Sequence, residues 1–178
     1  MLKGKEFLAW SDGSCDNKNP NKPGGAAYII TDMNGNVIKR KSKGFLHTTN
    51  NRMEQLAIIS IINSLPFGSS VTIYTDSRYC ITALNSQKPK KNLDQIALYH
   101  KICKEKHLSV YFQHVKGHSG NKYNEECDKM ARKEYNNINN KISKPSEEEK
   151  QNIFTNKFEE LYYSQITTKG RRKRVKKK

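Results

Sequence analysis

The order of strand and helix patterns changes partway along this chain, and the change limits the folds open to it. Three strand patterns follow one another with no helix between them: 5–14, 25–32 and 36–45. Asn34 and Gly35 join the last two as a hairpin, because this dipeptide favours the positive φ angles of tight turns. Strand patterns at 70–75 and 108–115 are then separated by helical ones. A hairpin meander followed by βα units predicts an α/β fold built on a mixed sheet, with helices on its faces.

Four segments have the apolar spacing and boundary residues of helices: 51–64, 77–86, 93–106 and 123–135. The first ends where Pro66 and Gly68 follow it, and Asn92 is placed to cap the third. The domain is expected to end near Asn137, because the polar run after it reads as a linker broken by Pro145.

The C-terminal segment 138–178 is expected to contain that linker, a short amphipathic helix and a basic tail. Ser146 is a suitable N-cap, glutamates follow it, and apolar residues recur at positions 153, 154, 158, 161 and 162. The last ten residues are mostly Lys and Arg and are expected to be disordered.

The formal net charge of +16 predicts a polyanionic partner, most often nucleic acid. An acidic membrane surface, or basicity that serves solubility alone, would also account for it. No apolar run is long enough to cross a membrane, and the N-terminus has no secretory pattern, so a cytoplasmic protein is expected. The cysteines lack metal-ligand spacing and are expected to be free thiols: Cys15, Cys80, Cys103 and Cys127.

Two acidic residues stand where predicted strands end. Asp12 closes the first strand pattern and Asp76 follows the pattern at 70–75. If these strands are neighbours, the two carboxylates repel each other unless a cation lies between them, and Mg²⁺ prefers carboxylate oxygen. Alternatively, Asp12 forms a turn with Gly13 and Asp76 caps the next helix.

Two further acids lie on predicted helices. Glu54 is one turn into the helix at 51–64, and Asp128 is in the helix at 123–135. Each has a structural alternative. Asn51 and Glu54 have the spacing of a capping box, and Asp128 fits a solvated helix face beside Asn124.

Four stretches, in this order, carry a resemblance to type 1 ribonuclease H: "SDGSC", "TTNNRMEQLA", "YTDSRY" and "VKGHSGNKYNEECDKMA". The resemblance covers about residues 5–135. It implies a five-stranded mixed sheet, three antiparallel strands then two parallel, flanked by helices on both faces. It also implies an endoribonuclease that hydrolyses the RNA strand of RNA–DNA hybrids with two metal ions, leaving 5′-phosphate and 3′-hydroxyl ends. Many bacterial relatives carry an extra helix with a basic protrusion, which is missing between "TDSRY" and "KNLDQ".

The resemblance also implies residue roles. Two Mg²⁺ ions, for which Mn²⁺ is able to substitute, are held by the metal-binding acids Asp12, Glu54, Asp76 and Asp128. His118 matches the family histidine that assists proton movement or product release; without the resemblance, the solvated loop histidine is the favoured reading.

Substrate contacts are implied in the same way. Asn50 and Asn51 match the pair that contacts ribose, and amides suit this task because they both donate and accept hydrogen bonds. Gly13, Ser14 and Cys15 are expected to line the same groove. Thr49 and Asn92 are expected to contact phosphates of the DNA strand, although Asn50 and Asn92 also fit plain helix capping.

Departures from the family pattern leave other functions open. Arg78 stands where relatives often carry an amide, and the loop "CDNKNPNKPGG" is longer than usual. The C-terminal tail either replaces the missing grip on substrate or serves as a nuclear localisation signal. The expected protein is a monomer that binds RNA–DNA hybrid. Alternatives are a ribonuclease H-like module that binds without catalysis and another nuclease on the same fold.

Overall fold

The computed structural model describes residues 4–117 and 119–143. They form one sheet of five strands in the order β3-β2-β1-β4-β5, together with four helices. The elements run along the chain as β1 (Glu6–Cys15), β2 (Gly24–Thr31), β3 (Val37–Phe45), α1 (Asn50–Ser64), β4 (Ser70–Thr75), α2 (Arg78–Asn85), α3 (Leu93–Lys106), β5 (Ser109–His114) and α4 (Lys122–Ser143). β1 pairs antiparallel with β2 and parallel with β4, and β5 is parallel to β4. The expected mixed sheet of three antiparallel and two parallel strands is therefore confirmed.

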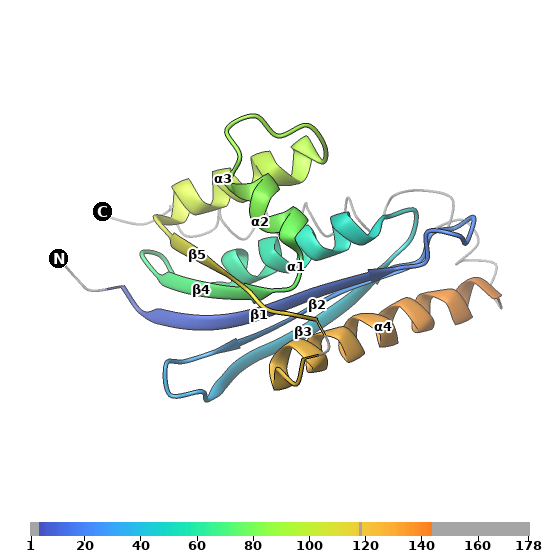
Figure 1. The fold of residues 1–178 in the computed structure, drawn as a ribbon, viewed down its shortest axis with the longest axis horizontal. Helices are drawn as coiled ribbons and strands as arrows, with labels where there is room; N and C mark the ends of the chain where they lie inside the picture. The colour runs from blue at the N-terminus through green and yellow to red at the C-terminus, as the bar shows by residue number, and fades with distance from the viewer. Residues whose placement is uncertain (1–3, 118, 144–178) are drawn as a thin grey trace, which may run out of the picture.

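Helices cover both faces of the sheet. α1, α2 and α3 lie on one side, and α4 lies on the other (Figure 1). The alternation of side chains along β1 fits this arrangement, because successive strand residues point to opposite faces. Phe7 and Ala9 join the core under α1, whereas Trp10 joins a smaller core with Cys127 and Ala131 of α4. β1 is thus buried on both sides, which fixes it rigidly in the middle of the fold.

At two helix starts the capping alternatives do not describe the structure. Thr49, not Asn51, is the N-cap of α1, and its side chain accepts a hydrogen bond from the Arg52 amide at 3.3 Å. Four consecutive residues that favour caps, 48–51, stand at this helix start, and the structure uses the second of them. Glu54 is consequently too far into the helix for a capping box. Ser77, not Asp76, caps α2 through the Cys80 amide.

The last helix is longer than the segment predicted over 123–135. α4 continues to Ser143 and passes the expected domain boundary at Asn137. Its later turns contact β3, since a Cβ added to Gly44 would lie 2.3 Å from Cγ1 of Ile138. Asn19 also donates a hydrogen bond of 3.1 Å to Asn139. These contacts give the polar end of the helix a packing surface.

No helix in the described ranges is long and apolar enough to cross a membrane. The amphipathic helix expected after Ser146 and the basic run at the C-terminus lie outside the described residues, as does His118.

Candidate active site

β1 extends beyond its pairing with β4. The parallel register between these strands ends at Trp10 and Tyr74, whereas β1 continues to Cys15 beside β2 alone. Asp12 lies in this extension, and Asp76 directly follows the end of β4. Asp12 and Asp76 therefore lie where β1 and β4 separate, at the edge of the opening between them.

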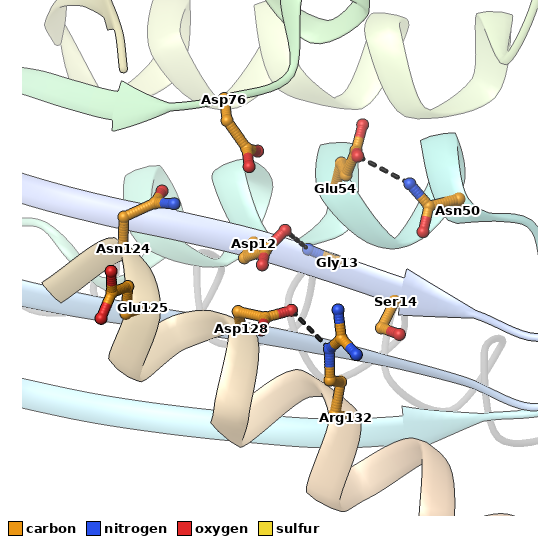
Figure 2. A pocket seen from close by; sticks show the side chains of 10 residues that line it. All are labelled: Asp12, Gly13, Ser14, Asn50, Glu54, Asp76, Asn124, Glu125, Asp128 and Arg132. Atoms are coloured by element: carbon orange, nitrogen blue, oxygen red, sulfur yellow. Dashed lines mark hydrogen bonds and ion pairs between the residues drawn. The ribbon is translucent and has the colours of Figure 1, made fainter. Parts of the chain in front are cut away.

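This opening is a pocket of about 210 Å³, shown in Figure 2. All four predicted acids line it, and they come from β1, α1, the residue after β4, and α4. The lining residues are Asp12, Gly13, Ser14, Asn50, Glu54, Asp76, Asn124, Glu125, Asp128 and Arg132. The structure thus brings together acids that are far apart in the sequence.

Gly13 allows α1 to approach β1 closely at the pocket. A Cβ at this position would lie 2.3 Å from the Glu54 nitrogen and 2.5 Å from the Met53 carbonyl carbon. Backbone atoms cannot move aside as the end of a flexible side chain can. The missing side chain therefore lets α1 rest on β1, and this places Glu54 next to Asp12.

The Glu54 carboxylate is oriented by two neighbouring side chains. Asn50 donates to Oε1 at 2.7 Å, and the hydroxyl of Ser77 donates to Oε2. Burial raises the pKa of Glu54, with a smaller contribution from the charge of Asp76, while the Ser77 and Asn50 hydrogen bonds oppose the rise. Because Ser77 also caps α2, the Asp76 side chain is not used as a cap.

Asp12 is the most strongly perturbed acid of the pocket. It is only 8% exposed, and burial raises its pKa from 3.8 to about 8. The charges of Asp76, Asp128 and Glu54 add to the rise, and the hydrogen bond of 2.7 Å from the Gly13 amide opposes it. A buried carboxylate among like charges needs a cation nearby to be stable in its charged form.

The perturbed pKa predicts how the stability of the metal-free protein depends on pH. In the unfolded chain Asp12 loses its proton near pH 3.8, whereas in the folded chain it keeps the proton until about pH 8. The unfolded state therefore binds fewer protons between these values, and the contribution of Asp12 to stability falls as pH rises. In urea unfolding of metal-free protein at pH 4, 6 and 8, the stability advantage of Asp12→Asn over wild type should grow with pH. A stability difference between Asp12→Asn and wild type that does not change with pH would contradict the raised pKa of Asp12.

Two residues of α4 complete the wall opposite α1. Asp128 accepts a hydrogen bond of 2.7 Å from Nε of Arg132, one turn further along the helix. Asn124 is 2% exposed, and within the part of the chain that the structure describes its Oδ1 has no hydrogen-bond partner. Buried oxygens almost always accept a hydrogen bond, so this one is available to a ligand that enters the pocket.

The chemistry of the pocket fits a hard divalent cation. Its donors are carboxylate and amide oxygens, which Mg²⁺ prefers, and its volume leaves room for water as well. Among the described residues, no three acids, histidines or cysteines stand close enough together to hold one ion as they are. Oxygens of Glu54 and Asp128 are engaged by Asn50, Ser77 and Arg132 instead.

Comparison with known proteins agrees with this architecture. The sequence model of the RNase H family matches residues 4–136. The chain belongs to the ribonuclease H family. Ribonuclease H of Chlorobaculum parvum is 38% identical over 144 residues, which is 72% of this chain and 94% of that protein. Ribonuclease HI of Synechocystis is 37% identical over 148 residues, covering 75% of this chain and 89% of its own length.

Solved structures of other ribonucleases H share the fold. Ribonuclease H1 of Halobacterium salinarum aligns with a TM-score of 0.63 at 16% identity, over 74% of this chain and 98% of its own. LC11 ribonuclease H1, solved in complex with an RNA/DNA hybrid, gives a TM-score of 0.63 at 20% identity, with the same coverage.

The predicted substrate contacts of this ribonuclease H lie in three places. Gly13, Ser14 and Asn50 line the pocket itself. Thr49 and the exposed Asn51 are at the first turn of α1, beside the pocket.

The remaining two contacts are further from the acids or engaged elsewhere. The thiol of Cys15 donates to the Thr48 carbonyl at 3.5 Å. Asn92 stands at the start of α3 with a left-handed backbone, and its side chain donates to the Tyr79 hydroxyl at 3.0 Å instead of capping the helix.

Three residues that the sequence did not single out shape this ribonuclease H pocket, Ser77, Glu125 and Arg132, and Gly117 has a role there that the sequence did not indicate. A Cβ at Gly117 would lie 2.7 Å from Oδ2 of Asp76, so the loop after β5 passes directly over that acid. The spacing of Asp128 and Arg132, four residues apart on a helix, was a sequence signal for their ion pair.

Proposed function

We propose that this chain is an endoribonuclease that hydrolyses the RNA strand of RNA–DNA hybrids and leaves 5′-phosphate and 3′-hydroxyl ends. The observation that carries the proposal is the pocket in which Asp12 is buried among three other acids, on a ribonuclease H fold. Its relatives in Chlorobaculum and Synechocystis are ribonucleases H, and LC11 ribonuclease H1 binds an RNA/DNA hybrid.

We propose Asp12, Glu54, Asp76 and Asp128 as the ligands of two Mg²⁺ ions, with Mn²⁺ able to replace them. When bound, such ions activate a water and stabilise charge on the phosphate and the leaving oxygen. The protein contributes orientation. Asn50 and Ser77 orient the Glu54 carboxylate through hydrogen bonds. Arg132 forms an ion pair with Asp128, which a divalent cation would have to displace in part.

Proton movement is assigned to His118, which follows Gly117 in the sequence. Gly117 contacts Asp76, so the chain enters this loop at the pocket wall. An imidazole titrates near neutral pH and is suited to accept or donate the proton of the reaction.

Recognition of the hybrid is assigned to the rim of the pocket. Asn50 and Asn51 would contact ribose hydroxyls, assisted by Gly13, Ser14 and Cys15, because an amide offers both donor and acceptor. Thr49 and Asn92 would contact the DNA strand at the starts of α1 and α3, where helix N-termini favour phosphate.

The organisation of the whole chain completes the proposal. Residues 1–137 would be the catalytic domain and 138–178 an appendage, and the protein would act as a monomer in the cytoplasm. Cysteines of the described residues are free thiols, as is typical of a reducing compartment.

Cleavage of end-labelled RNA–DNA hybrid, duplex DNA and duplex RNA of one sequence tests the proposed function. With Mg²⁺, only the RNA strand of the hybrid should be cut, and chelation by EDTA should stop the reaction. Tight binding of the hybrid without cleavage would identify a binding module. Cleavage of duplex DNA would identify another nuclease on this fold.

A further inference from the structure

Strand β5 places its side chains in two different environments. Val110 and Phe112 pack against the core on the side of α1, α2 and α3. Tyr111, which lies between them, points to the opposite face of the sheet, because successive strand residues alternate. Its side chain is 61% exposed, and among the described residues no other ring stacks on it. A rigid strand therefore presents an exposed aromatic ring on the side of the sheet that carries α4.

The described helices leave this part of the sheet open. α4 packs on β1, β2 and β3, whereas α1, α2 and α3 lie on the other side of the sheet (Figure 1). Within the ranges that the structure describes, β4 and β5 therefore have no helix layer on the α4 side. The registers of β1 with β4 and of β4 with β5 align the residues of this face in rows across the strands. We call the face formed by Leu8, Thr72, Tyr74, Tyr111 and Gln113 the open half-sheet.

The open half-sheet combines flat rings with side chains that form hydrogen bonds. The rings of Tyr74 and Trp10 stack with their centroids 5.0 Å apart and their planes 11° apart, which holds Tyr74 in place. Tyr111 lies on the next strand, two residues before the partner of Tyr74, and is therefore about 8 Å away. Thr72 and Gln113 add a hydroxyl and an amide. Proteins bind unpaired nucleobases on such sheets, by stacking on the rings and by hydrogen bonds to the base edges.

The open half-sheet adjoins the acid pocket. Asp12 stands two positions beyond Trp10 on β1, and Asp76 stands two positions beyond Tyr74 at the end of β4. The distance from Asp76 back to Thr72, the neighbour of Tyr111, is about 13 Å, which roughly four nucleotides of a stacked strand would span. A nucleic-acid strand with one phosphate in the pocket therefore reaches the open half-sheet within a few nucleotides.

The charges around the open half-sheet favour a nucleic acid over a second copy of this chain. Lys116 and Lys122 are exposed at its pocket end, and the Lys122 ammonium lies 5.4 Å from the centre of the Tyr123 ring, which contacts Trp10. Glu6, an acid of this face, stands at the far end of β1. A second copy would bring another formal charge of +16 and would be repelled, whereas a polyanion would be attracted.

We propose that the open half-sheet binds single-stranded nucleic acid that continues from a hybrid held in the acid pocket. An unpaired base would stack on Tyr111 and its neighbour would lie near Tyr74, with Lys116 and Lys122 close to the phosphates. The protein would then prefer hybrids that end in, or adjoin, a single strand. The placement of the hybrid rests on the proposed function, but the binding of unpaired bases does not.

Binding of fluorescent nucleic acids to the full-length protein in EDTA and low salt tests the proposal without cleavage. The probes are a blunt RNA–DNA hybrid, the same hybrid with about six unpaired thymidines added to either end of its DNA strand, and oligothymidine alone. The variants are Tyr111→Ala, which removes the ring, and Tyr111→Phe, which keeps it. Phe67→Ala is the matched control, because Phe67 is a ring of similar exposure, 68%, at the opposite end of β4 from the pocket.

We expect the unpaired extension to raise the affinity of the wild type about five- to tenfold, since stacking of single bases contributes at least this much. Tyr111→Ala should lose this gain, bind oligothymidine more weakly and bind the blunt hybrid like the wild type. Tyr111→Phe and Phe67→Ala should retain the gain. If the chain cleaved no hybrid but kept this dependence on Tyr111, the proposed function would fail and the present inference would stand.

Three results would overturn the inference. The extension could add nothing to the affinity of the wild type, or Tyr111→Ala and Phe67→Ala could weaken binding equally. Sedimentation could also show wild-type dimers that Tyr111→Ala abolishes, because a second copy would then cover the open half-sheet.

Discussion

Asp12→Asn is expected to reduce hybrid cleavage at least a hundredfold and to raise the melting temperature of the metal-free protein. The loss follows because a neutral amide would be a weaker ligand for a divalent cation than a carboxylate, and removal of a single preorganised electrostatic group at a reacting centre costs about 10²–10³ in rate. The gain in stability follows because burial, and to a lesser degree the charges of Asp76, Asp128 and Glu54, disfavour a carboxylate at this position. Function and stability should therefore change in opposite directions.

Single-turnover cleavage and thermal unfolding in EDTA measure these two effects. Glu6→Gln is the matched control, since it removes an exposed acid from the same strand, away from the pocket. The control should leave both quantities unchanged. Full cleavage activity of Asp12→Asn would refute the assignment of Asp12 as a metal ligand. A drop in its melting temperature would refute the conclusion that burial and neighbouring charges make the Asp12 carboxylate destabilising.

Gly13→Ala is expected to lower both stability and activity. The added methyl group would lie 2.3 Å from the backbone nitrogen of Glu54, so α1 has to move away from β1. Overpacking of this kind typically costs about 1–3 kcal/mol, and displacement of α1 also separates Glu54 from Asp12. We expect the melting temperature to fall by roughly 4–12 °C.

The control for this substitution is Gly35→Asn, in the hairpin between β2 and β3. Gly35 has a φ of 84°, where Asn is strained less than most residues, and no atom lies within 4 Å of a Cβ placed there. This variant should lose less stability than Gly13→Ala and should keep its activity. If Gly13→Ala behaved like the control, the contact between α1 and β1 would not be what positions Glu54.

The order and bounds of most elements could be predicted because their signals are local. The strand at 70–75 lies between Gly68 and the Asp76 that follows it, and a run of β-branched and aromatic residues marks its length. The predicted α3, 93–106, also agrees with the structure. The end of α4 could not be predicted, since Ile138 and Ile142 are isolated apolar residues in a polar run and Gly44, the partner of Ile138, is far away in the sequence.

Predicting that the four acids meet in one pocket required more than local sequence signals. Strand ends and the family resemblance pointed to the residues, but which of their oxygens are engaged depends on contacts between distant elements. Ser77 shows this well. Its sequence context suggests a helix start, whereas its bond to Glu54 becomes visible only when α1 is in place. Such pairings are set by packing and leave no periodic pattern.

The position of Asp128 on the last described helix has a consequence during protein synthesis. When β5 has emerged from the ribosome, the nascent chain holds all five strands and three of the four acids. It still lacks α4, which supplies the remaining acid and covers Trp10 and Ile29 on the far face of the sheet. Cleavage competence should therefore arise only near the end of translation of the domain, when this helix docks.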